Sequence, residues 1–323
     1  MNQVKIGYIG LGRMGKNMVL RLLEQGIEVV AWNRSPEPIE DIKNQISKSK
    51  NTDQKLKIAN DLEELVNSLE KPRVIWLMLP AGGVTDQFIG KLLPLLSAGD
   101  LLIDGANSFY KDTLRRSSEL LKSGIHFMDI GVSGGPAGAR SGACLMIGGS
   151  SEDFEKIKDL AKAAGAPGAY QHLGAQGSGH LAKMVHNAIE YGMMESLGEG
   201  LAILKHSEFK YDFSRLLDLY NHKSVIESRL VGWAKEAFDE DPNLSDISSI
   251  IGSGGAGKER IKAEGDWTIE LAQKLGVDAP SIEASMKVRS DSSNVEESSP
   301  NGFRNKVVSA LRGKFGAHAV KKS

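Results

Sequence analysis

The chain has 323 residues, of which 41% are hydrophobic and 25% are charged, and its formal net charge is −1. This composition is typical of a globular protein with one large or two ordinary domains. The near-neutral charge excludes a global field that would attract nucleic acid or an anionic membrane surface. The single cysteine, Cys144, excludes an internal disulfide and a cysteine-rich metal site, and no metal is expected.

The N-terminal half alternates short apolar runs with helical periodicity, which predicts a mainly parallel sheet covered by helices. Strands are predicted at residues 4–9, 28–32, 74–79, 101–103, 126–130 and 144–147. The first strand follows Met1 almost directly, which leaves no room for a signal peptide. No apolar run approaches the ~20 residues of a membrane span. We therefore expect a cytoplasmic protein that contacts no membrane.

Helical periodicity replaces the strand pattern beyond residue 178. Helices are predicted at residues 180–206, 213–219, 225–238, 267–274, 282–288 and 306–311. Two polar stretches, residues 44–57 and 290–302, lack this periodicity and are predicted to be exposed loops.

A glycine-rich run, Gly10-Leu11-Gly12-Arg13-Met14-Gly15, joins the first predicted strand to the first predicted helix. In this context the spacing indicates a dinucleotide site, because the glycines let the backbone approach a pyrophosphate and the helix N-terminus offers free N–H groups. The alternative is a plain tight turn. The predicted fold is therefore α/β: a Rossmann-type doubly wound sheet in residues 1–178, followed by an all-α domain in residues 179–323.

The second predicted strand ends at Asn33-Arg34-Ser35. An NAD site usually has an acidic residue here for the ribose 2′-hydroxyl, whereas a guanidinium suits a 2′-phosphate. The pattern favours NADP over NAD, and the alternative is that Arg34 is an ordinary surface arginine.

Two further turns follow strands whose carboxyl ends would face the ligand crevice. Asn107, in the run 104–108, is a candidate for binding cofactor or substrate. Ser133, Gly134 and Gly135 offer a hydroxyl and backbone N–H groups that suit a carboxylate, and the alternative is a flexible connector.

The run 183–191 is predicted to lie on the first long helix of the second domain. Helical spacing places Lys183, His186, Asn187 and Glu190 on one face. A lysine and a carboxylate that converge in this way suit proton transfer, and the alternative is a solvated polar stripe. The basic run 312–318 taken alone is a C-terminal tail, of a kind that is commonly disordered.

These motifs resemble, in order and spacing, those of the 6-phosphogluconate dehydrogenases, in the short form of that family within the β-hydroxyacid dehydrogenase superfamily. The specific parts are Lys183-x-x-His186-Asn187-x-x-Glu190-Tyr191 and the terminal Phe315-Gly316-Ala317-His318. The resemblance implies oxidative decarboxylation of 6-phosphogluconate to ribulose 5-phosphate and CO₂ with reduction of NADP or NAD. It also implies a homodimer or higher homo-oligomer, in which the C-terminal tail completes the neighbouring site.

The resemblance further implies roles for individual residues. Lys183 would be the catalytic base and Glu190 the catalytic acid. Substrate would be bound by Asn107, Ser133, Gly134, Gly135, His186, Asn187, Tyr191, Thr268, Arg289, Arg312 and His318. The dinucleotide would be bound by Gly10, Gly12, Arg13, Met14, Gly15, Asn33, Arg34, Ser35, Leu79 and Asn107.

The chain departs from the long form of the family at Gly265-Asp266-Trp267-Thr268, where that form has a phosphate-binding lysine in place of Asp266. Asp266 would repel a phosphate if it faced the site, and Lys258 is a candidate replacement cation. Two other functions stay open. One is a different β-hydroxyacid dehydrogenase, such as a 3-hydroxyisobutyrate dehydrogenase or a glyoxylate/succinic semialdehyde reductase, and the other is a non-catalytic NADP-binding protein.

Overall fold

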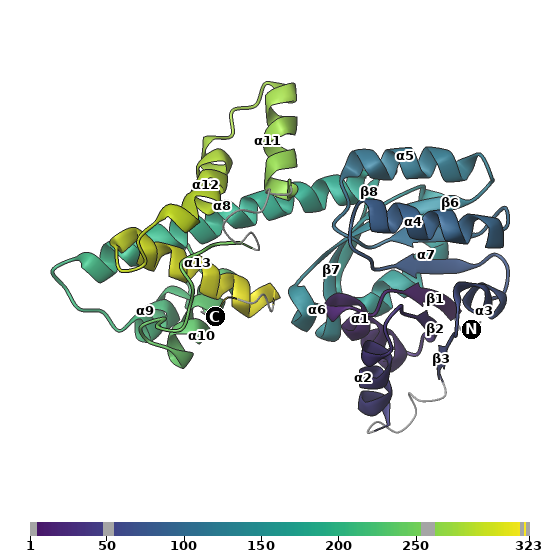
Figure 1. Ribbon diagram of the computed structural model, residues 1–323, viewed down its shortest axis with the longest axis horizontal. Coiled ribbons are helices and arrows are strands. Elements are labelled where there is room, and N and C mark those ends of the chain that lie inside the picture. The colour runs from purple at the N-terminus through teal and green to yellow at the C-terminus, as the bar shows by residue number, and fades with distance from the viewer. Residues whose placement is uncertain (1–4, 48–54, 253–261, 317–319, 321–323) are drawn as a thin grey trace. The chain divides into compact units, whose positions relative to one another are not determined.

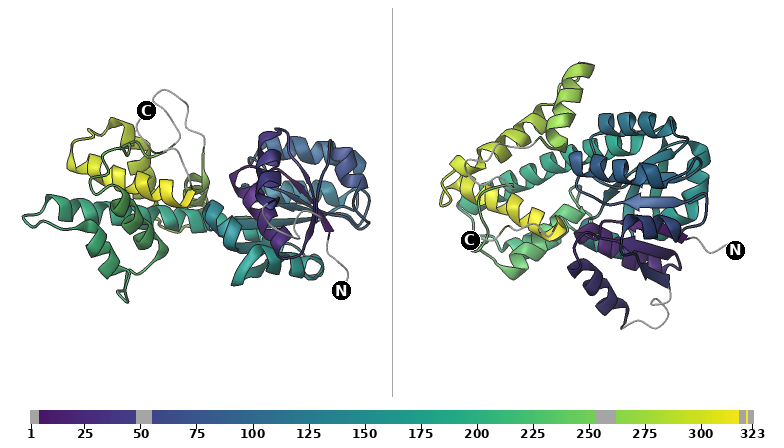
Figure 2. Two further views of the ribbon diagram at one scale, coloured as in Figure 1. Left: turned by 90° about the horizontal axis from the view of Figure 1, so that it is seen from below. Right: turned by 45° about the vertical axis from the view of Figure 1, so that its right-hand side comes forward.

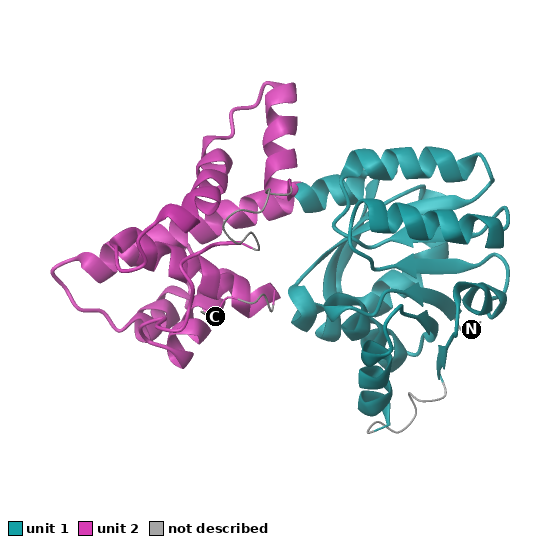
Figure 3. Cartoon of the chain, viewed as in Figure 1, with its two compact units in different colours: residues 1–184 teal, residues 185–323 magenta. Residues whose placement is uncertain are grey.

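The structure, a computed structural model, describes residues 5–47, 55–252, 262–316 and 320. The chain divides into two compact units, residues 1–184 and 185–323, which Figure 3 shows in different colours. The division falls inside one continuous helix, α8 (Ser178–His206), whose first residue is the expected domain boundary. In the part of the chain that is described, no helix is long and apolar enough to cross a membrane.

The first unit is built on one eight-stranded sheet with the order β3-β2-β1-β4-β5-β6-β7-β8 (Figures 1 and 2). All neighbouring strands are parallel except β6 and β7, which are antiparallel. The strands are β1 (Lys5–Ile9), β2 (Glu28–Trp32), β3 (Leu56–Ile58), β4 (Val74–Leu77), β5 (Leu101–Asp104), β6 (His126–Ser133), β7 (Ala143–Gly148) and β8 (Gly165–Gly174).

Helices cover both faces of this sheet, so the first unit has two apolar layers. Buried strand residues alternate between the layers: Tyr8 belongs to one and Ile9 to the other. One layer contains α1 (Arg13–Glu24), α2 (Glu37–Ile46), α6 (Gly135–Ser141) and α7 (Ser151–Ala164). The other contains α3 (Leu62–Asn67), α4 (Gly83–Leu92) and α5 (Tyr110–Leu121), and a short 3₁₀ turn (Leu93–Leu95) follows α4. The predicted doubly wound sheet is confirmed.

Two strands of this sheet were not predicted from the sequence. The strand β3 has only three residues and overlaps the end of the stretch 44–57 that was expected to be a loop. The strand β8 begins Gly-Ala-Pro-Gly and lacks the apolar alternation by which strands are recognised. Both strands are defined by pairing with a neighbour, β3 with β2 and β8 with β7, which local sequence does not encode.

In the second unit, the regular elements that the structure describes are all helical, as predicted. They are the greater part of α8, α9 (Phe213–Tyr220), α10 (Arg229–Glu240), α11 (Glu264–Leu275), α12 (Pro280–Asp291), a 3₁₀ turn (Ser292–Asn294) and α13 (Pro300–Gly316). Residues of α8, α9, α10 and α13 form its apolar core. The helices α11 and α12 pack closely, since a Cβ at Gly265 would overlap the Met286 sulfur. The stretch 290–302, expected to be a loop, contains the 3₁₀ turn and the first residues of α13.

Candidate active site

The glycine-rich turn between β1 and α1 has the geometry that a dinucleotide needs. Gly10 has a φ of +98°, and a Cβ at Gly15 would overlap the Gly10 carbonyl oxygen, so the turn requires both glycines. A Cβ at Gly12 would meet nothing within 4 Å, so the turn is open on that side. No side chain caps α1, and its first turn holds no acidic residue. These residues therefore fit a pyrophosphate at the helix N-terminus.

Asn33 connects the end of β2 to this turn. Its Oδ1 accepts a hydrogen bond from the Leu11 N–H at 2.8 Å, and its Nδ2 donates to the Ser35 carbonyl oxygen at 2.8 Å. The side chain therefore fixes the two segments that would surround the adenosine ribose. Arg34 is exposed and has no ion-pair partner among the residues that the structure describes, so its guanidinium is available to an anion.

The turn after β5 exposes Asn107 between buried neighbours. Asp104, which is fully buried, accepts hydrogen bonds from the Ala106 N–H and the Ser108 hydroxyl. These bonds fold the turn back on the strand end, while Asn107 itself is exposed. The structure thus places this predicted residue at the carboxyl edge of the sheet.

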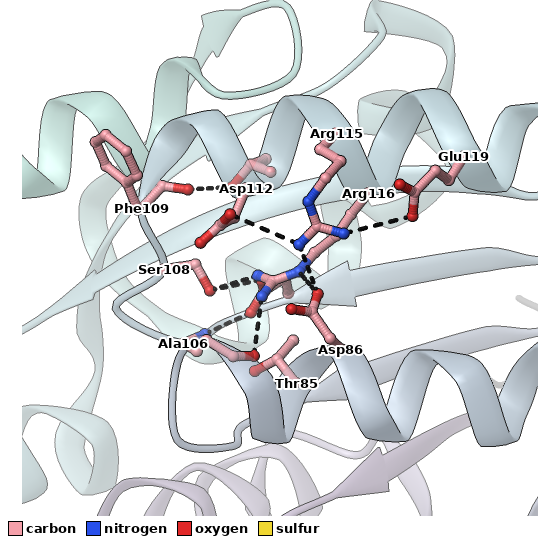
Figure 4. Close-up of polar contacts among 12 residues, drawn as sticks. Thr85, Asp86, Ala106, Ser108, Phe109, Asp112, Arg115, Arg116 and Glu119 are labelled. Atoms are coloured by element: carbon pink, nitrogen blue, oxygen red, sulfur yellow. Dashed lines mark hydrogen bonds and ion pairs between the residues drawn. The ribbon is translucent and has the colours of Figure 1, made fainter.

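Arg116 holds this turn in place by hydrogen bonds (Figure 4). It was not predicted from the sequence. Its guanidinium is 1% exposed and donates to Asp104, Ser108, Asp86 and the Gly82 carbonyl oxygen over 2.8–3.1 Å. It therefore joins the segment after β4, which contains Leu79, to the segment after β5. A signal did exist, because the buried positions Thr113, Arg116 and Leu120 share one helical face of α5.

The loop after β6 holds Ser133, Gly134 and Gly135. Ser133 is the last residue of β6, and α6 begins at Gly135. The two glycines have φ values of +119° and +62°, which L side chains rarely adopt. The loop consequently presents a hydroxyl and a helix N-terminus at the same edge of the sheet as the turn after β5.

The predicted polar face of α8 is present but is not a solvated stripe. Lys183 and Asn187 are each only 7% exposed, and His186 and Glu190 are half-buried. His186 Nδ1 lies 3.1 Å from Asn187 Oδ1 and 3.8 Å from a Glu190 carboxylate oxygen. Glu264, which sequence reasoning also missed, accepts hydrogen bonds from Asn187 Nδ2 at 3.1 Å and the Tyr191 hydroxyl at 3.4 Å.

Two arginines meet beside Tyr191 in the second unit. The Arg289 guanidinium stacks on the Tyr191 ring at 3.9 Å from its centroid. Burial, reinforced by the charge of Glu264, raises the pKa of Tyr191 to about 12, and burial together with Arg289 lowers the pKa of Arg312 to about 10. Among the described residues neither guanidinium has an ion-pair partner. Two neighbouring guanidinium groups that form no ion pair within this part of the structure are suited to binding an anion.

The acid that replaces the expected lysine has a structural role. Asp266 Oδ2 accepts a hydrogen bond from the Ala263 N–H at 2.9 Å, which caps the first turn of α11. Thr268 is buried and donates its hydroxyl to the Glu264 carbonyl oxygen at 2.8 Å. His318 and Lys258, the two other predicted residues, lie outside the described residues.

Comparisons with known proteins identify the family of this chain. Two family models match consecutive parts of the chain: the NAD binding domain of 6-phosphogluconate dehydrogenase over residues 5–174, and the 6-phosphogluconate dehydrogenase C-terminal domain over residues 179–322. An NAD(+)-dependent, decarboxylating 6-phosphogluconate dehydrogenase of Haloferax volcanii is 33% identical over 98% of this chain and 98% of its own length. An NADP(+)-dependent, decarboxylating enzyme of Bacillus subtilis is 39% identical over 92% of this chain and 63% of its own length.

Solved structures of similar fold include a 6-phosphogluconate dehydrogenase. Plasmodium falciparum 6-phosphogluconate dehydrogenase, known in its apo form and in complexes with NADP+ and with 6-phosphogluconate, matches with a TM-score of 0.78 and 29% identity, over 95% of this chain and 70% of that chain. A Mycobacterium tuberculosis 3-hydroxyisobutyrate dehydrogenase shares the fold, with a TM-score of 0.68 at 18% identity over 96% of this chain and 99% of that chain. The cofactor of the present chain is a nicotinamide dinucleotide, NAD or NADP, and the chain belongs to the 6-phosphogluconate dehydrogenase family of oxidoreductases.

Proposed function

We propose that this enzyme oxidatively decarboxylates 6-phosphogluconate to ribulose 5-phosphate and CO₂. The observation that carries the proposal is the pair Arg289 and Arg312 beside Tyr191, because a phosphorylated substrate needs such an anion site and a small non-phosphorylated acid does not. Tyr191 belongs to the same helix as Lys183 and Glu190, so one element carries a phosphate ligand, a base and an acid.

The dinucleotide would be held by the glycine-rich turn and by the residues around it. Gly10, Gly12, Arg13, Met14 and Gly15 would bind the pyrophosphate through backbone N–H groups. Asn33, Arg34 and Ser35 would surround the adenosine ribose, and Leu79 and Asn107 would lie toward the nicotinamide. When bound, the nicotinamide supplies a hydride acceptor.

Lys183 is proposed to take the proton from the C3 hydroxyl as hydride leaves C3. A lysine base must act as the neutral amine, which withdrawal from water favours, and this side chain is 7% exposed. The resulting 3-keto acid loses CO₂ because the ketone accepts the electron pair as an enolate. The Lys183 ammonium would then donate a hydrogen bond to that oxygen, and Glu190 would protonate C1 of the enediol.

The remaining predicted residues would orient the substrate. Its carboxylate and hydroxyls would be bound by Asn107, Ser133, Gly134, Gly135, His186 and Asn187. Its phosphate would be bound by Tyr191, Arg289 and Arg312, with Thr268 and His318 nearby. We propose that the enzyme works as a homodimer or higher homo-oligomer.

The proposal is tested by steady-state assays with 6-phosphogluconate and with each of NAD+ and NADP+. We expect turnover with release of CO₂, and no comparable turnover of 3-hydroxyisobutyrate. Arg289→Met should raise KM for 6-phosphogluconate about 10- to 100-fold, because a charge-assisted hydrogen bond contributes about 1.5–3 kcal/mol. The control Arg215→Met, at an exposed arginine of α9, should leave KM unchanged. Good turnover of 3-hydroxyisobutyrate without turnover of 6-phosphogluconate would refute the proposal.

A further inference from the structure

A buried carboxylate lies next to the start of the helix that carries Lys183. Asp129, in the middle of β6, is 0% exposed. One of its oxygens accepts a hydrogen bond from the Gly177 N–H and the other from the His180 N–H, both at 2.7 Å. Among the described residues it has no cationic partner. Its carboxylate is therefore stabilised by backbone N–H groups at the N-terminus of α8.

The strand β6 and the helix α8 continue in contact beyond this point. Alternate residues of a strand share a face, so Asp129, Gly131 and Ser133 lie on one side of β6. A Cβ at Gly131 would overlap the Cβ of Lys183, and a Cβ at Gly179 would lie 2.8 Å from the Asp129 carbonyl oxygen. The lysine stem therefore packs directly against the strand backbone.

The spacing of the two elements explains why this contact repeats. Four residues of a helix advance about 6.0 Å, and two residues of a strand advance about 6.6 Å. Gly179 and Lys183, four residues apart, therefore match Asp129 and Gly131, two residues apart. A shift of α8 along β6 would move the lysine amine relative to Ser133 by the same amount.

We propose that Asp129 is a positioning residue for Lys183. By binding both N–H groups, its carboxylate fixes the first turn of α8 along β6 and thereby fixes the amine relative to the substrate hydroxyl. The inference rests on the proposed role of Lys183 as the base. A misplacement of a catalytic group by about 1 Å can lower a rate about 100-fold. The position of the first turn of α8 therefore affects the rate as well as the stability of the fold.

The test is Asp129→Asn in the full chain. The amide keeps the shape but offers one acceptor oxygen, so its NH₂ faces one of the two backbone N–H groups. We expect kcat with 6-phosphogluconate to fall about 10- to 100-fold while the cofactor KM stays within twofold. The deuterium isotope effect on kcat with 3-deuterated substrate should rise, because hydride transfer becomes rate-limiting. A purely structural role would reduce the amount of folded enzyme and leave this isotope effect unchanged.

Asp153→Asn is the matched control. Asp153 is also a buried carboxylate, 2% exposed, and it binds His126 at the opposite end of β6. This variant should lower the melting temperature but leave kcat per folded molecule and the isotope effect unchanged. If Asp129→Asn does not fold, Asp129→Glu, which keeps the charge but moves the carboxylate by one methylene, should raise the same isotope effect.

Folded Asp129→Asn with wild-type kcat and isotope effect would overturn the inference. An inactive wild-type enzyme would instead refute the proposed substrate. Asp129 would then be judged with the 2-deuterated or 3-deuterated hydroxyacid that the enzyme does oxidise.

Discussion

At the scale of single residues, burial changes the ionisation of the Glu195 carboxyl. It lies on α8, is 6% exposed, and has a carboxylate oxygen 3.1 Å from Arg304 Nε. Burial raises its pKa from 4.5 to about 7 although Arg304 acts in the opposite direction. The free-energy cost of burying this charge therefore exceeds the stabilisation from its interaction with Arg304.

We predict that Glu195→Gln removes a pH dependence of stability. Below pH 4.5 the carboxyl is neutral in both the folded and the unfolded chain. Between pH 4.5 and about 7 the Glu195 carboxyl is ionised in the unfolded chain but neutral in the folded chain. The free energy of unfolding of the wild type therefore falls as pH rises. Glutamine does not titrate. The variant should gain, relative to the wild type, on the order of 3 kcal/mol between pH 4.5 and pH 8.

Urea titrations of both proteins at the two pH values measure this difference. Glu283→Gln, at an exposed glutamate of α12, is the control and should show no such gain. A difference between Glu195→Gln and wild type that is independent of pH would contradict the assignment.

Site residues could be predicted from the sequence where local spacing brings them together, but not where the tertiary fold does. Lys183, Asn187 and Glu190 were predicted from helical spacing, because a helix fixes which side chains share a face. Glu264 was missed because it lies 77 residues from Asn187, which it binds, and only the tertiary fold brings them together. Asp266 was expected to repel a phosphate only if it faced the site, and its side chain instead accepts a hydrogen bond from the Ala263 N–H.

At the scale of elements, the polar network around Arg116 connects α5, α4 and the turn after β5. Its contacts reach the fully buried Asp104. The adjacent Arg115, whose side chain is exposed, forms ion pairs with Asp86 and Glu119 (Figure 4). The two neighbouring arginines differ in burial but not in chemistry, so they form an internal comparison.

We predict that Arg116→Met lowers the free energy of unfolding by about 3–5 kcal/mol, because it leaves the buried carboxylate of Asp104 without its cation. Arg115→Met should change it by less than about 0.5 kcal/mol, because its partners are exposed. Chemical denaturation of both variants at pH 7 tests this. An equal decrease in the free energy of unfolding of the two variants would mean that burial of the Arg116 network does not contribute to stability.

Elements too were predictable where local sequence defines them and were missed where tertiary contacts define them. Strands with clear alternation or continuous apolar runs, such as β1 and β4, were predicted because burial imposes that pattern. The strands β3 and β8 were not, because their pairing with β2 and β7 defines them. The helix α13 begins before its predicted start because Pro300 suits a first helical turn, although the surrounding serines indicated a loop.

At the scale of the whole molecule, Arg312 lies beside Tyr191 of its own chain, whereas the resemblance implies that the C-terminal tail completes the neighbouring site. Arg312 lies on α13, where Leu311 is 0% exposed and the Phe315 ring lies 5.6 Å from that of Trp233 in the same core. The charge of Arg312 also acts on Tyr191 of its own chain. Both contacts lie within one chain.

We therefore predict that Arg312 serves the site of its own chain. Mixed oligomers of Lys183→Ala and Arg312→Ala chains, co-expressed with two tags and purified on both, distinguish the two arrangements. If the arginine were exchanged, one site of each mixed pair would hold both native residues and turn over with the wild-type KM for 6-phosphogluconate. If it acts within its chain, no site holds both, and only the raised KM of Arg312→Ala should be seen. Mixed oligomers of wild-type and Lys183→Ala chains should retain the wild-type KM at half the rate, because an inactive neighbour then leaves an intact site untouched.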